Sequence, residues 1–354
     1  MKKIAFVLPR PTQKIVGGFK VVYDYARYLS QHETDVTIIY DCHEIGTRFS
    51  IRSNFVKLAW GKYLYKKAEW AHMPSNIHIQ FVGSKIKNSD YDLLIATALN
   101  TVVTVSKAEM HKHAKKAYFI QGFENWGVDD TEVYESYSLP MKKIVVSKWL
   151  YEIVKKYDSE DNIFYCSNGI DTDIFYPEKD IYLRNSRSIL FMYHEDERKG
   201  IETLKPILKR LRREFPDLVI SAFGAFEKPT DILLDNYVSY ANEQQLHELY
   251  NSSSIFVCPS YTEGFGLTGA EAMACGCALV TTDTNGSREY ADDSNSMICK
   301  THNEEDLYEK IKSLLTNKEI MYRISKKGSN DIKRMSLLES EKGFLKIIEK
   351  ILDD

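Results

Sequence analysis

The sequence predicts an α/β fold in which two domains, each a parallel β-sheet covered by helices, follow one another along the chain. Short apolar, β-branched runs alternate with longer amphipathic stretches, a pattern typical of a parallel sheet with helices on both faces. This alternation stops at a more polar segment and starts again in the second half. A chain of 354 residues is also long enough for two medium-sized domains.

In the first half, each expected strand is a short run of apolar or β-branched residues. Ile4–Leu8 is the first, and Gly18–Ser30 follows as a helix with an apolar face. Further strands are expected at Val36–Tyr40, Ile77–Val82, Leu93–Ala98, Lys116–Ile120 and Ile144–Ser147.

In the second half, the same alternation begins again after Asn168–Arg187, a segment with few apolar runs that we interpret as the linker. The predicted domains are therefore residues 1–167 and 168–334. The expected strands are Ile189–Tyr193, Leu218–Phe223, Val238–Tyr240, Ile255–Cys258 and Ala278–Thr281. The expected helices are Ile201–Phe215, Glu243–Tyr250 and Leu267–Cys275, followed by a mostly helical stretch from Glu304 with breaks near Asn317 and Gly328.

Composition excludes several classes of protein. With 44% apolar residues, 27% charged residues and a net charge of −3, the chain is neither disordered nor a general nucleic-acid binder. Six cysteines without paired CxxC spacing argue against a disulfide framework and against a zinc site. The apolar run at the N-terminus is too short for a signal sequence, and no run approaches a membrane span, so a cytoplasmic protein is expected.

The most informative segment is PSYTEGFGLTGAEAMACG, which follows the strand that ends at Cys258. Gly264 and Gly266 permit a tight turn, and helical character begins near Leu267 and ends at Gly276. The free N–H groups and the dipole of the first helical turn form an anion site that suits a phosphate.

Two carboxylates flank this predicted phosphate site. Glu263 lies in the turn and Glu271 lies on the helix, and a carboxylate can accept hydrogen bonds from two sugar hydroxyls. The combination fits a nucleotide sugar, with the diphosphate at the helix end, one glutamate on the hexose and the other on the ribose. The alternative is an ordinary glycine-rich turn with two surface glutamates.

Glu263 and Glu271, within EGFGLTGAEAMACG, resemble the signature of the GT-B retaining glycosyltransferases grouped as family 4 (glycosyl transferases group 1). Gly17-Gly18 resembles the glycine loop of that family, and Arg198-Lys199-Gly200 its basic phosphate site. The segments 146–150 and 168–171 resemble its inter-domain landmarks. The resemblance implies two Rossmann-like domains facing a cleft, with a final helix, 335–354, packing back on the first domain.

The resemblance also implies roles for residues of the donor site. Glu263 would contact hydroxyls of the transferred sugar, Glu271 would hold the ribose, and Lys199 with Arg198 would neutralise the leaving diphosphate. The main-chain amides of the turn would hold sugar and diphosphate; they belong to Phe265, Gly266, Leu267 and Thr268. The nucleobase is expected near the ends of two strands, at Gly224, Tyr240 and Ala241.

The sequence departs from the family pattern at two places. Position 194 is His where relatives often carry Arg, so either Arg198 or His194 would serve the phosphate. The turn that often holds a His is here Gln121-Gly122-Phe123-Glu124, in which Gln121 could bind a sugar hydroxyl or cap a strand, and Glu124 could orient the acceptor. Gly17 and Gly18 would bring N–H groups to the diphosphate or acceptor, or form a turn that needs a positive φ.

Two Asp-x-Asp motifs, Asp90-Tyr-Asp92 and Asp171-Thr-Asp173, resemble metal sites of the other large glycosyltransferase fold. The first begins a strand at its amino end and the second lies in the linker, so we interpret both as solvated loops. The expectation is that no metal and no other cofactor is essential.

The segment 52–70 interleaves basic and aromatic residues, and residues 1–165 carry 23 Lys and Arg against 18 Asp and Glu. This pattern suits an anionic membrane surface. It could also stack on RNA bases, which nothing else in the sequence supports, or be a helix packed on the sheet with lysines outward. The residues concerned are Arg52, Phe55, Lys57, Leu58, Trp60, Lys62, Tyr63, Leu64, Tyr65, Lys66, Lys67 and Trp70.

Together these features predict a retaining transferase that moves a hexose-type sugar from a nucleoside diphosphate donor to an oligosaccharide or glycolipid acceptor in cell-surface polysaccharide biosynthesis. The second domain would bind the donor and the first the acceptor, and the expected location is the cytoplasm, with peripheral contact at the inner face of the plasma membrane and no nucleic-acid partner. The alternatives are a nucleotide-sugar epimerase of similar shape and a catalytically silent paralogue that acts as a binding partner.

Overall fold

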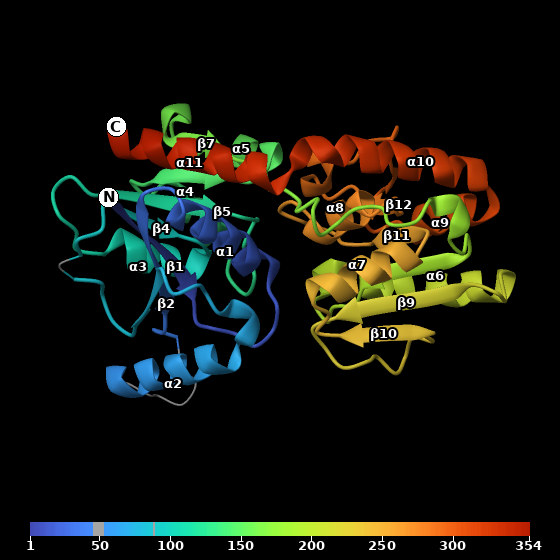
Figure 1. The fold of residues 1–354 in the computed structure, drawn as a ribbon, viewed down its shortest axis with the longest axis horizontal. Helices are drawn as coiled ribbons and strands as arrows, with labels where there is room; N and C mark the ends of the chain where they lie inside the picture. Colours follow the sequence, from blue (N-terminus) through green and yellow to red (C-terminus); the bar gives the residue numbers. More distant parts are fainter. Residues whose placement is uncertain (45–52, 88) are drawn as a thin grey trace. The chain divides into compact units, whose positions relative to one another are not determined.

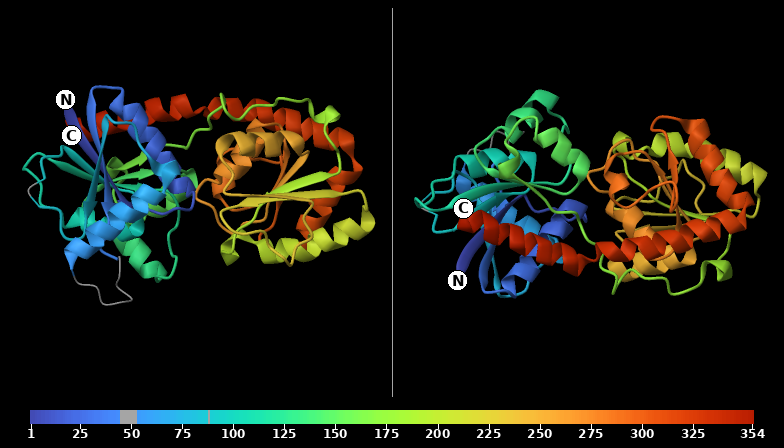
Figure 2. Two further views of the ribbon diagram at one scale, coloured as in Figure 1. Left: turned by 60° about the horizontal axis from the view of Figure 1, so that its bottom comes forward. Right: turned by 90° about the horizontal axis from the view of Figure 1, so that it is seen from above.

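The computed structural model describes residues 1–44, 53–87 and 89–354, and these form two compact units. The first unit is Met1–Ser167 together with Ser340–Asp354, and the second is Asn168–Glu339. Each unit is a parallel sheet with helices on both faces (Figures 1 and 2). The predicted class of two Rossmann-like α/β domains is therefore confirmed.

The sheet of the first unit has the strand order β3-β2-β1-β4-β5-β6-β7, with parallel pairing throughout. Its strands are β1 (Lys2–Pro9), β2 (Thr34–Asp41), β3 (Ile77–Val82), β4 (Leu93–Ala96), β5 (Lys115–Ile120), β6 (Lys142–Val145) and β7 (Ile163–Tyr165). Its helices are α1 (Gly17–Ser30), α2 (Asn54–Lys67), α3 (Leu99–Ser106), α4 (Asp130–Tyr137) and α5 (Lys148–Val154).

The sheet of the second unit has the order β10-β9-β8-β11-β12-β13 and is likewise parallel. Its strands are β8 (Ser188–Met192), β9 (Val219–Gly224), β10 (Asn236–Ser239), β11 (Ile255–Cys258), β12 (Ala278–Thr282) and β13 (Met297–Cys299). Its helices are α6 (Ile201–Glu214), α7 (Glu243–Ser252), α8 (Leu267–Ala274), α9 (Glu304–Thr316) and α10 (Lys318–Asp331). In both sheets the strand order reverses beside the first strand, which is where ligands of such sheets bind.

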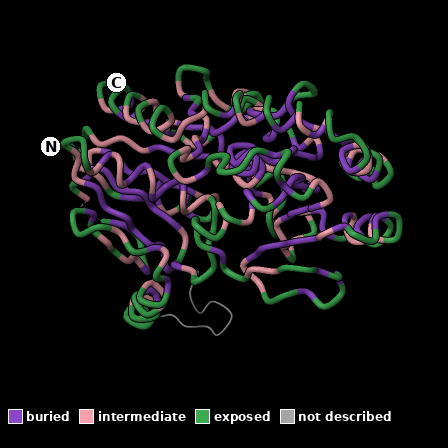
Figure 3. The backbone as a smooth tube through the Cα atoms, turned by 45° about the vertical axis from the view of Figure 1, so that its right-hand side comes forward, coloured by how far each residue is buried: buried purple, intermediate pink, exposed green. Residues whose placement is uncertain are grey.

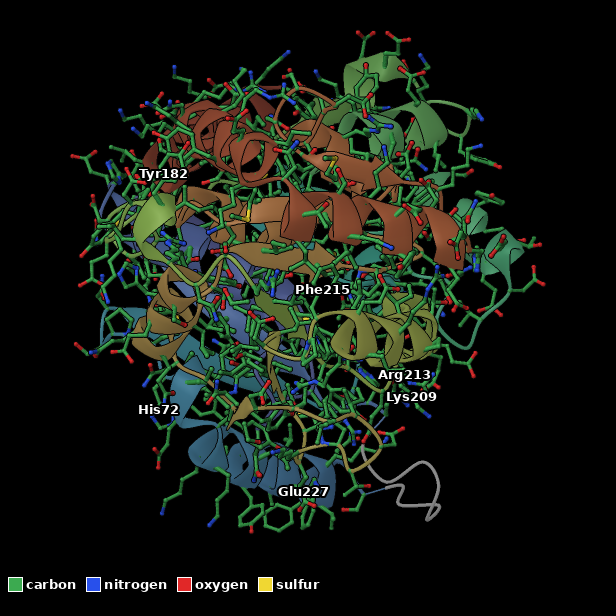
Figure 4. The ribbon with its side chains drawn as sticks, turned by 90° about the vertical axis from the view of Figure 1, so that its right-hand side faces the viewer. His72, Tyr182, Lys209, Arg213, Phe215 and Glu227 are labelled. Carbon is green, nitrogen blue, oxygen red and sulfur yellow. The ribbon has the colours of Figure 1, made fainter. Side chains whose placement is uncertain are left out.

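The core of the second unit shows how the sequence pattern becomes packing. Strands β8, β11 and β12 and most of α8 are buried, whereas α6, α9 and α10 are buried along one side (Figure 3). In α6 the apolar residues Ile201, Leu204 and Leu211 recur on the buried face. Lys209 and Arg213, four residues apart, stand on the outer side of this helix (Figure 4).

The final helix, α11 (Leu337–Asp353), begins at the end of the second unit and continues into the first. Phe344 is fully buried there and stacks on Tyr25 at 4.2 Å between ring centroids, with Phe6 and Phe119 beside it. Ser340 Oγ lies 2.7 Å from Tyr25 Oη. These contacts make the chain from Ser340 onward part of the core of the first unit.

The breaks expected near Asn317 and Gly328 lie close to those found. Helix α9 ends at Thr316 and α10 ends at Asp331, three residues after Gly328. Gly328 itself lies inside α10, where a Cβ would lie 2.9 Å from Met273 Cε.

The segment 168–187 is not an open linker, since Phe175 and Ile181 are buried in the second unit. Arg184 is buried as well and donates hydrogen bonds to the carbonyl oxygens of residues 179, 250, 253 and 275.

Replacing Phe344 by Ala is expected to destabilise the first unit by about 3–5 kcal/mol, because it leaves a cavity among three aromatic rings. Urea unfolding followed by near-ultraviolet circular dichroism would measure the loss. Lys346→Ala, at an exposed position of the same helix, is the control and should change the free energy of unfolding little. Equal stability of the two variants would contradict this account of the core.

Candidate active site

Residues predicted to bind a ligand lie at the switch point of the second sheet. Strands β8 and β11 are neighbours there, and the chain leaves both of them at the carboxyl edge. The segment after β8 carries Lys199, and the segment after β11 carries Glu263. The topology thus brings together two side chains that are 64 residues apart in sequence.

Lys199 and Glu263 form an ion pair with 2.7 Å between Nζ and Oε1. Their side chains are only 23% and 13% exposed, so the pair is mostly shielded from water. Burial lowers the pKa of Lys199, but the charge of Glu263 and its hydrogen bond raise it, and the net shift is upward. Lys199 therefore stays a cation at neutral pH.

The loop that carries Lys199 is fixed by local capping. The short 3₁₀ helix η5 (Glu197–Lys199) begins at Asp196, whose side chain accepts a hydrogen bond from the N–H of Arg198. It ends at Gly200, which has φ +67° and faces Pro259. A Cβ at position 200 would lie 1.9 Å from the carbonyl oxygen of Pro259, so only glycine fits this approach.

Glu263 is held by two further contacts that the sequence analysis did not predict. Ser260 Oγ donates a hydrogen bond of 2.7 Å to Oε1, the same oxygen that Lys199 contacts. The backbone of Glu263 pairs with Asn285, and a Cβ on the next residue, Gly286, would lie 2.3 Å from the carbonyl oxygen of Glu263. The Asn-Gly pair after β12 is a turn signal that could have indicated this support.

The turn after Glu263 ends in the N-terminus of α8, as predicted. Gly266 is the N-cap with φ +91°, and Tyr290 Oη donates a hydrogen bond of 2.8 Å to its carbonyl oxygen. The first intrahelical bonds begin at the N–H of Gly269 and Ala270. The amides of Leu267 and Thr268 therefore belong to the first turn, where N–H groups have no intrahelical partner. Phe265 is buried, with its ring 5.3 Å from that of Tyr290.

Glu271 lies one turn further along α8 and is buried. Tyr250 Oη donates a hydrogen bond of 3.1 Å to its Oε2. Burial and the neighbouring Glu271 raise the pKa of Tyr250 well above its usual range, so the phenol keeps its proton and remains a donor. The sequence analysis did not anticipate this tyrosine.

Arg198 pairs within its own loop, whereas His194 contacts both its own loop and Phe226 after β9. Arg198 forms a two-pronged ion pair with Asp196, with its Nε 2.9 Å from Oδ1. His194 accepts a hydrogen bond at Nδ1 from the N–H of Asp196, and its ring meets Phe226 edge-on at 4.9 Å. Lys199 is thus the basic residue of this loop that pairs with Glu263.

The expected base-binding residues lie at the carboxyl ends of β9 and β10. Gly224 ends β9, and its carbonyl oxygen accepts a hydrogen bond of 2.8 Å from the N–H of Tyr240. Tyr240 has φ +54° and is half exposed, whereas Ala241 is buried. A Cβ at Gly224 would lie 2.5 Å from the carbonyl oxygen of Tyr193, which explains the glycine.

In the first unit, the structure joins two of the predicted features. Gly17 and Gly18 begin α1 after β1, and Gln121 follows β5. Gln121 Nε2 donates a hydrogen bond of 3.0 Å to the carbonyl oxygen of Gly18. Gly18 has no positive φ, and a Cβ there would make a tight contact of 3.3 Å with Gln121 Nε2.

Glu124 is buried and accepts a hydrogen bond at Oε2 from the N–H of Leu99, the first residue of α3. Burial raises the pKa of Glu124 to about 7, although the Leu99 hydrogen bond acts in the opposite direction. Tyr137 lies nearby, and its buried hydroxyl has no hydrogen-bond partner within the described residues.

The Asp-x-Asp motifs contact the backbone and a lysine of the protein: Asp90-Tyr-Asp92 meets Lys3 of β1, and Asp171-Thr-Asp173 forms a local turn. Asp92 accepts a hydrogen bond of 2.8 Å from the N–H of Lys3, and Asp90 pairs with the Lys3 side chain. Asp171 accepts hydrogen bonds from the N–H groups of Asp173 and Ile174, as in a capped turn. No cluster of three or more His, Cys, Asp or Glu side chains that could hold a metal ion occurs in the described part of the chain.

Two successive parallel sheets of Rossmann order match the GT-B fold of glycosyltransferases. Residues 177–331, which lie within the second unit, match the family "Glycosyl transferases group 1". The second unit therefore contains a region similar to the group 1 glycosyltransferases.

Similar proteins agree with this assignment. An uncharacterized glycosyltransferase of Methanocaldococcus jannaschii is 25% identical over 219 residues, which cover 60% of each chain. A Campylobacter jejuni enzyme, N,N'-diacetylbacillosaminyl-diphospho-undecaprenol alpha-1,3-N-acetylgalactosaminyltransferase, is 33% identical over 106 residues, or 30% of this chain and 28% of the enzyme. The chain thus spans between about a quarter and three fifths of these curated relatives.

Among solved structures, TarM from S. aureus, a mutant in complex with fondaparinux, alpha-GlcNAc-glycerol and UDP, superposes with a TM-score of 0.74 at 12% identity, covering 100% of both chains. At this identity the similarity establishes the fold.

The free energy of unfolding of Glu124→Gln is expected to increase relative to that of wild type as the pH rises from 5 to 8. The pKa of Glu124 is raised on folding, so its contribution to stability is present below the unfolded pKa and is lost as the pH passes about 7. Gln keeps the hydrogen bond from Leu99 without the charge, so the gain should reach on the order of 3 kcal/mol.

Thermal unfolding at pH 5 and pH 8 would measure this difference. Glu135→Gln, an exposed position on α4, is the matched control and should show no pH-dependent difference from wild type. A Glu124→Gln profile parallel to that of wild type would contradict the assigned burial.

Proposed function

We propose that this protein is a retaining glycosyltransferase that moves a hexose-type sugar from a nucleoside diphosphate donor to an oligosaccharide or glycolipid acceptor in cell-surface polysaccharide biosynthesis. The observation that carries the proposal is the shielded Lys199–Glu263 pair beside the N-terminus of α8. A cation, a carboxylate and free backbone amides at one sheet edge suit a sugar linked to a diphosphate.

The donor is bound by the second unit in this proposal. The diphosphate lies at the first turn of α8, where the amides of Leu267 and Thr268 and the ammonium group of Lys199 meet its charge. Within the described residues, both side-chain hydrogen bonds of Glu263 use Oε1, so a sugar hydroxyl can approach Oε2. Glu271, oriented by Tyr250, accepts hydrogen bonds from the ribose hydroxyls. TarM, which shares the fold, was solved in complex with UDP, and this supports a nucleoside diphosphate as ligand.

The reaction exchanges two bonds at the anomeric carbon of the sugar. The bond from this carbon to the diphosphate oxygen breaks, and a bond to an acceptor hydroxyl oxygen forms on the same face. The proton of the acceptor hydroxyl goes to the leaving diphosphate, so no protein carboxylate needs to act as nucleophile. Lys199 stabilises the negative charge that grows on the leaving group, which is the main electrostatic demand of the step.

The acceptor is bound by the first unit, near the start of α1 at Gly17 and Gly18, to which Gln121 is hydrogen-bonded. The name of the Campylobacter jejuni relative contains a diphospho-undecaprenol acceptor, which supports a lipid-linked acceptor here. Glu124 is buried against α3, so in this proposal it positions the loop after β5.

Lys199→Met and Glu263→Gln should each lower kcat by about 10²–10³-fold, because each removes a group aimed at the reacting part of the donor. Transfer from a panel of nucleoside diphosphate sugars, chosen by thermal shift, would be measured with an oligosaccharide acceptor. Lys209→Met, an exposed lysine on α6, is the control and should retain the wild-type rate. Full activity in both site variants, with folding intact, would refute the assigned roles.

Chelation of divalent metals is expected to change the transfer rate by less than about twofold from the rate without chelator. The reason is that Lys199 supplies the positive charge that a metal would otherwise provide. Rates with EDTA and with added magnesium or manganese would test this. A loss of activity in EDTA that manganese restores would show that the donor needs a metal in addition to Lys199.

A further inference from the structure

Helix α2 has an unusual outer surface in the first unit. It packs near the edge strand β3, at the margin of the sheet (Figure 1). Phe55, Trp60 and Tyr63 point outward and are 81%, 51% and 49% exposed. Trp60 and Tyr63 lie side by side, with 5.4 Å between ring centroids. Large aromatic side chains are costly to leave in water, so a cluster of them on one helix indicates a binding surface.

The inner face of α2 is already satisfied by the sheet. Gly61 is buried against Cys42 and Phe81, where a Cβ would lie 2.5 Å from Cys42 Sγ. The ring of Tyr65 lies 5.4 Å from that of Tyr40. These contacts agree with the sequence alternative of a helix packed on the sheet with lysines outward, and the structure adds that aromatic residues lie on the outer side as well. Arg52, the first residue of the predicted basic-aromatic segment, lies outside the described residues.

The charge of α2 indicates what its outer aromatic face binds. The helix contains four lysines and no acidic residue. Lys62, Lys66 and Lys67 are exposed next to the outward aromatic rings, and Lys67 Nζ lies 6.0 Å from the Tyr63 centroid. Lysines beside exposed tryptophan and phenylalanine match the headgroup region of an anionic bilayer, where rings enter the interface and ammonium groups meet the lipid phosphates.

We propose that the outer face of α2, Phe55 to Lys67, docks the protein on an anionic membrane surface. Among the described residues, no helix is long and apolar enough to cross a membrane, so the contact proposed is one of adsorption. It deepens the proposed function, since a surface-bound enzyme can reach a lipid-linked acceptor.

The end of α2 is connected to the predicted acceptor loop. After α2 and the short helix η2 (Glu69–Ala71), Trp70 donates a hydrogen bond from Nε1 to the carbonyl oxygen of Thr12 at 3.1 Å. Its ring also packs beside Phe19 and Tyr23 of α1. The chain before Gly17 is therefore held against η2, which directly follows the proposed docking helix, and Ile15 and Val16 there are also exposed.

Flotation of the full chain with vesicles would test the proposal. Binding is expected to vesicles of phosphatidylcholine with phosphatidylglycerol, to weaken at high salt, and to be at least tenfold weaker with phosphatidylcholine alone. Lys62→Glu/Lys66→Glu and Phe55→Ser/Trp60→Ser should each weaken binding roughly tenfold or more. Lys112→Glu/Lys156→Glu makes the same change in net charge at exposed positions of the same unit and should bind like wild type.

Several outcomes would overturn the proposal. They are no flotation with anionic vesicles, equal binding of the α2 and control variants, or a concentration-dependent dimer that is lost in Phe55→Ser/Trp60→Ser without any vesicle binding. Circular dichroism and transfer to a soluble acceptor would show that the variants are folded. Because flotation needs no substrate, failure of the proposed transferase activity would leave this test intact, and failure of flotation would leave the activity intact.

Discussion

The candidate site depends on one interaction, the ion pair between Lys199 and Glu263 across the switch point of the second sheet. Two opposite charges shielded from water are tolerated only when they are paired and hydrogen-bonded. Ser260, the cap at Asp196 and the turn at Gly286 all restrict where the two side chains can lie. The pair therefore keeps both charges in place before a ligand arrives, which is the electrostatic preorganisation that charge-developing reactions require.

Close backbone contacts set the shape around this pair. A Cβ on Gly200 would overlap the carbonyl oxygen of Pro259, and a Cβ on Gly286 would overlap the carbonyl oxygen of Glu263. Gly266 is needed for a different reason, because its φ of +91° starts α8 in a left-handed conformation and aims the first helical turn. The loops after β8, β11 and β12 are thereby locked together at one edge of the sheet.

The sequence was sufficient for elements whose signal is local. Ile77–Val82 and Ile255–Cys258 have the predicted bounds, and the turn at Gly266 leads into a helix at Leu267 as expected. Contacts between distant segments could not be predicted, because no periodic pattern encodes them: Tyr250 on Glu271 and Ser260 on Glu263 are examples. Strands β7 and β13, of three residues each, are too short to give a signal.

The two units differ in what their predicted polar side chains contact. In the second unit, the predicted polar groups Lys199 and Glu263 face one another and can exchange their contact for a ligand. In the first unit, Gln121 and Glu124 are bound to backbone groups, the carbonyl of Gly18 and the N–H of Leu99. The positive end of the α3 dipole favours the charged form of Glu124, whereas burial favours the neutral form, and the resulting pKa of about 7 means that both are populated near neutral pH. In the proposed function, specificity for an acceptor in this unit then comes from loop shape, which Gln121 and Glu124 set through the backbone, more than from direct contacts of these two side chains.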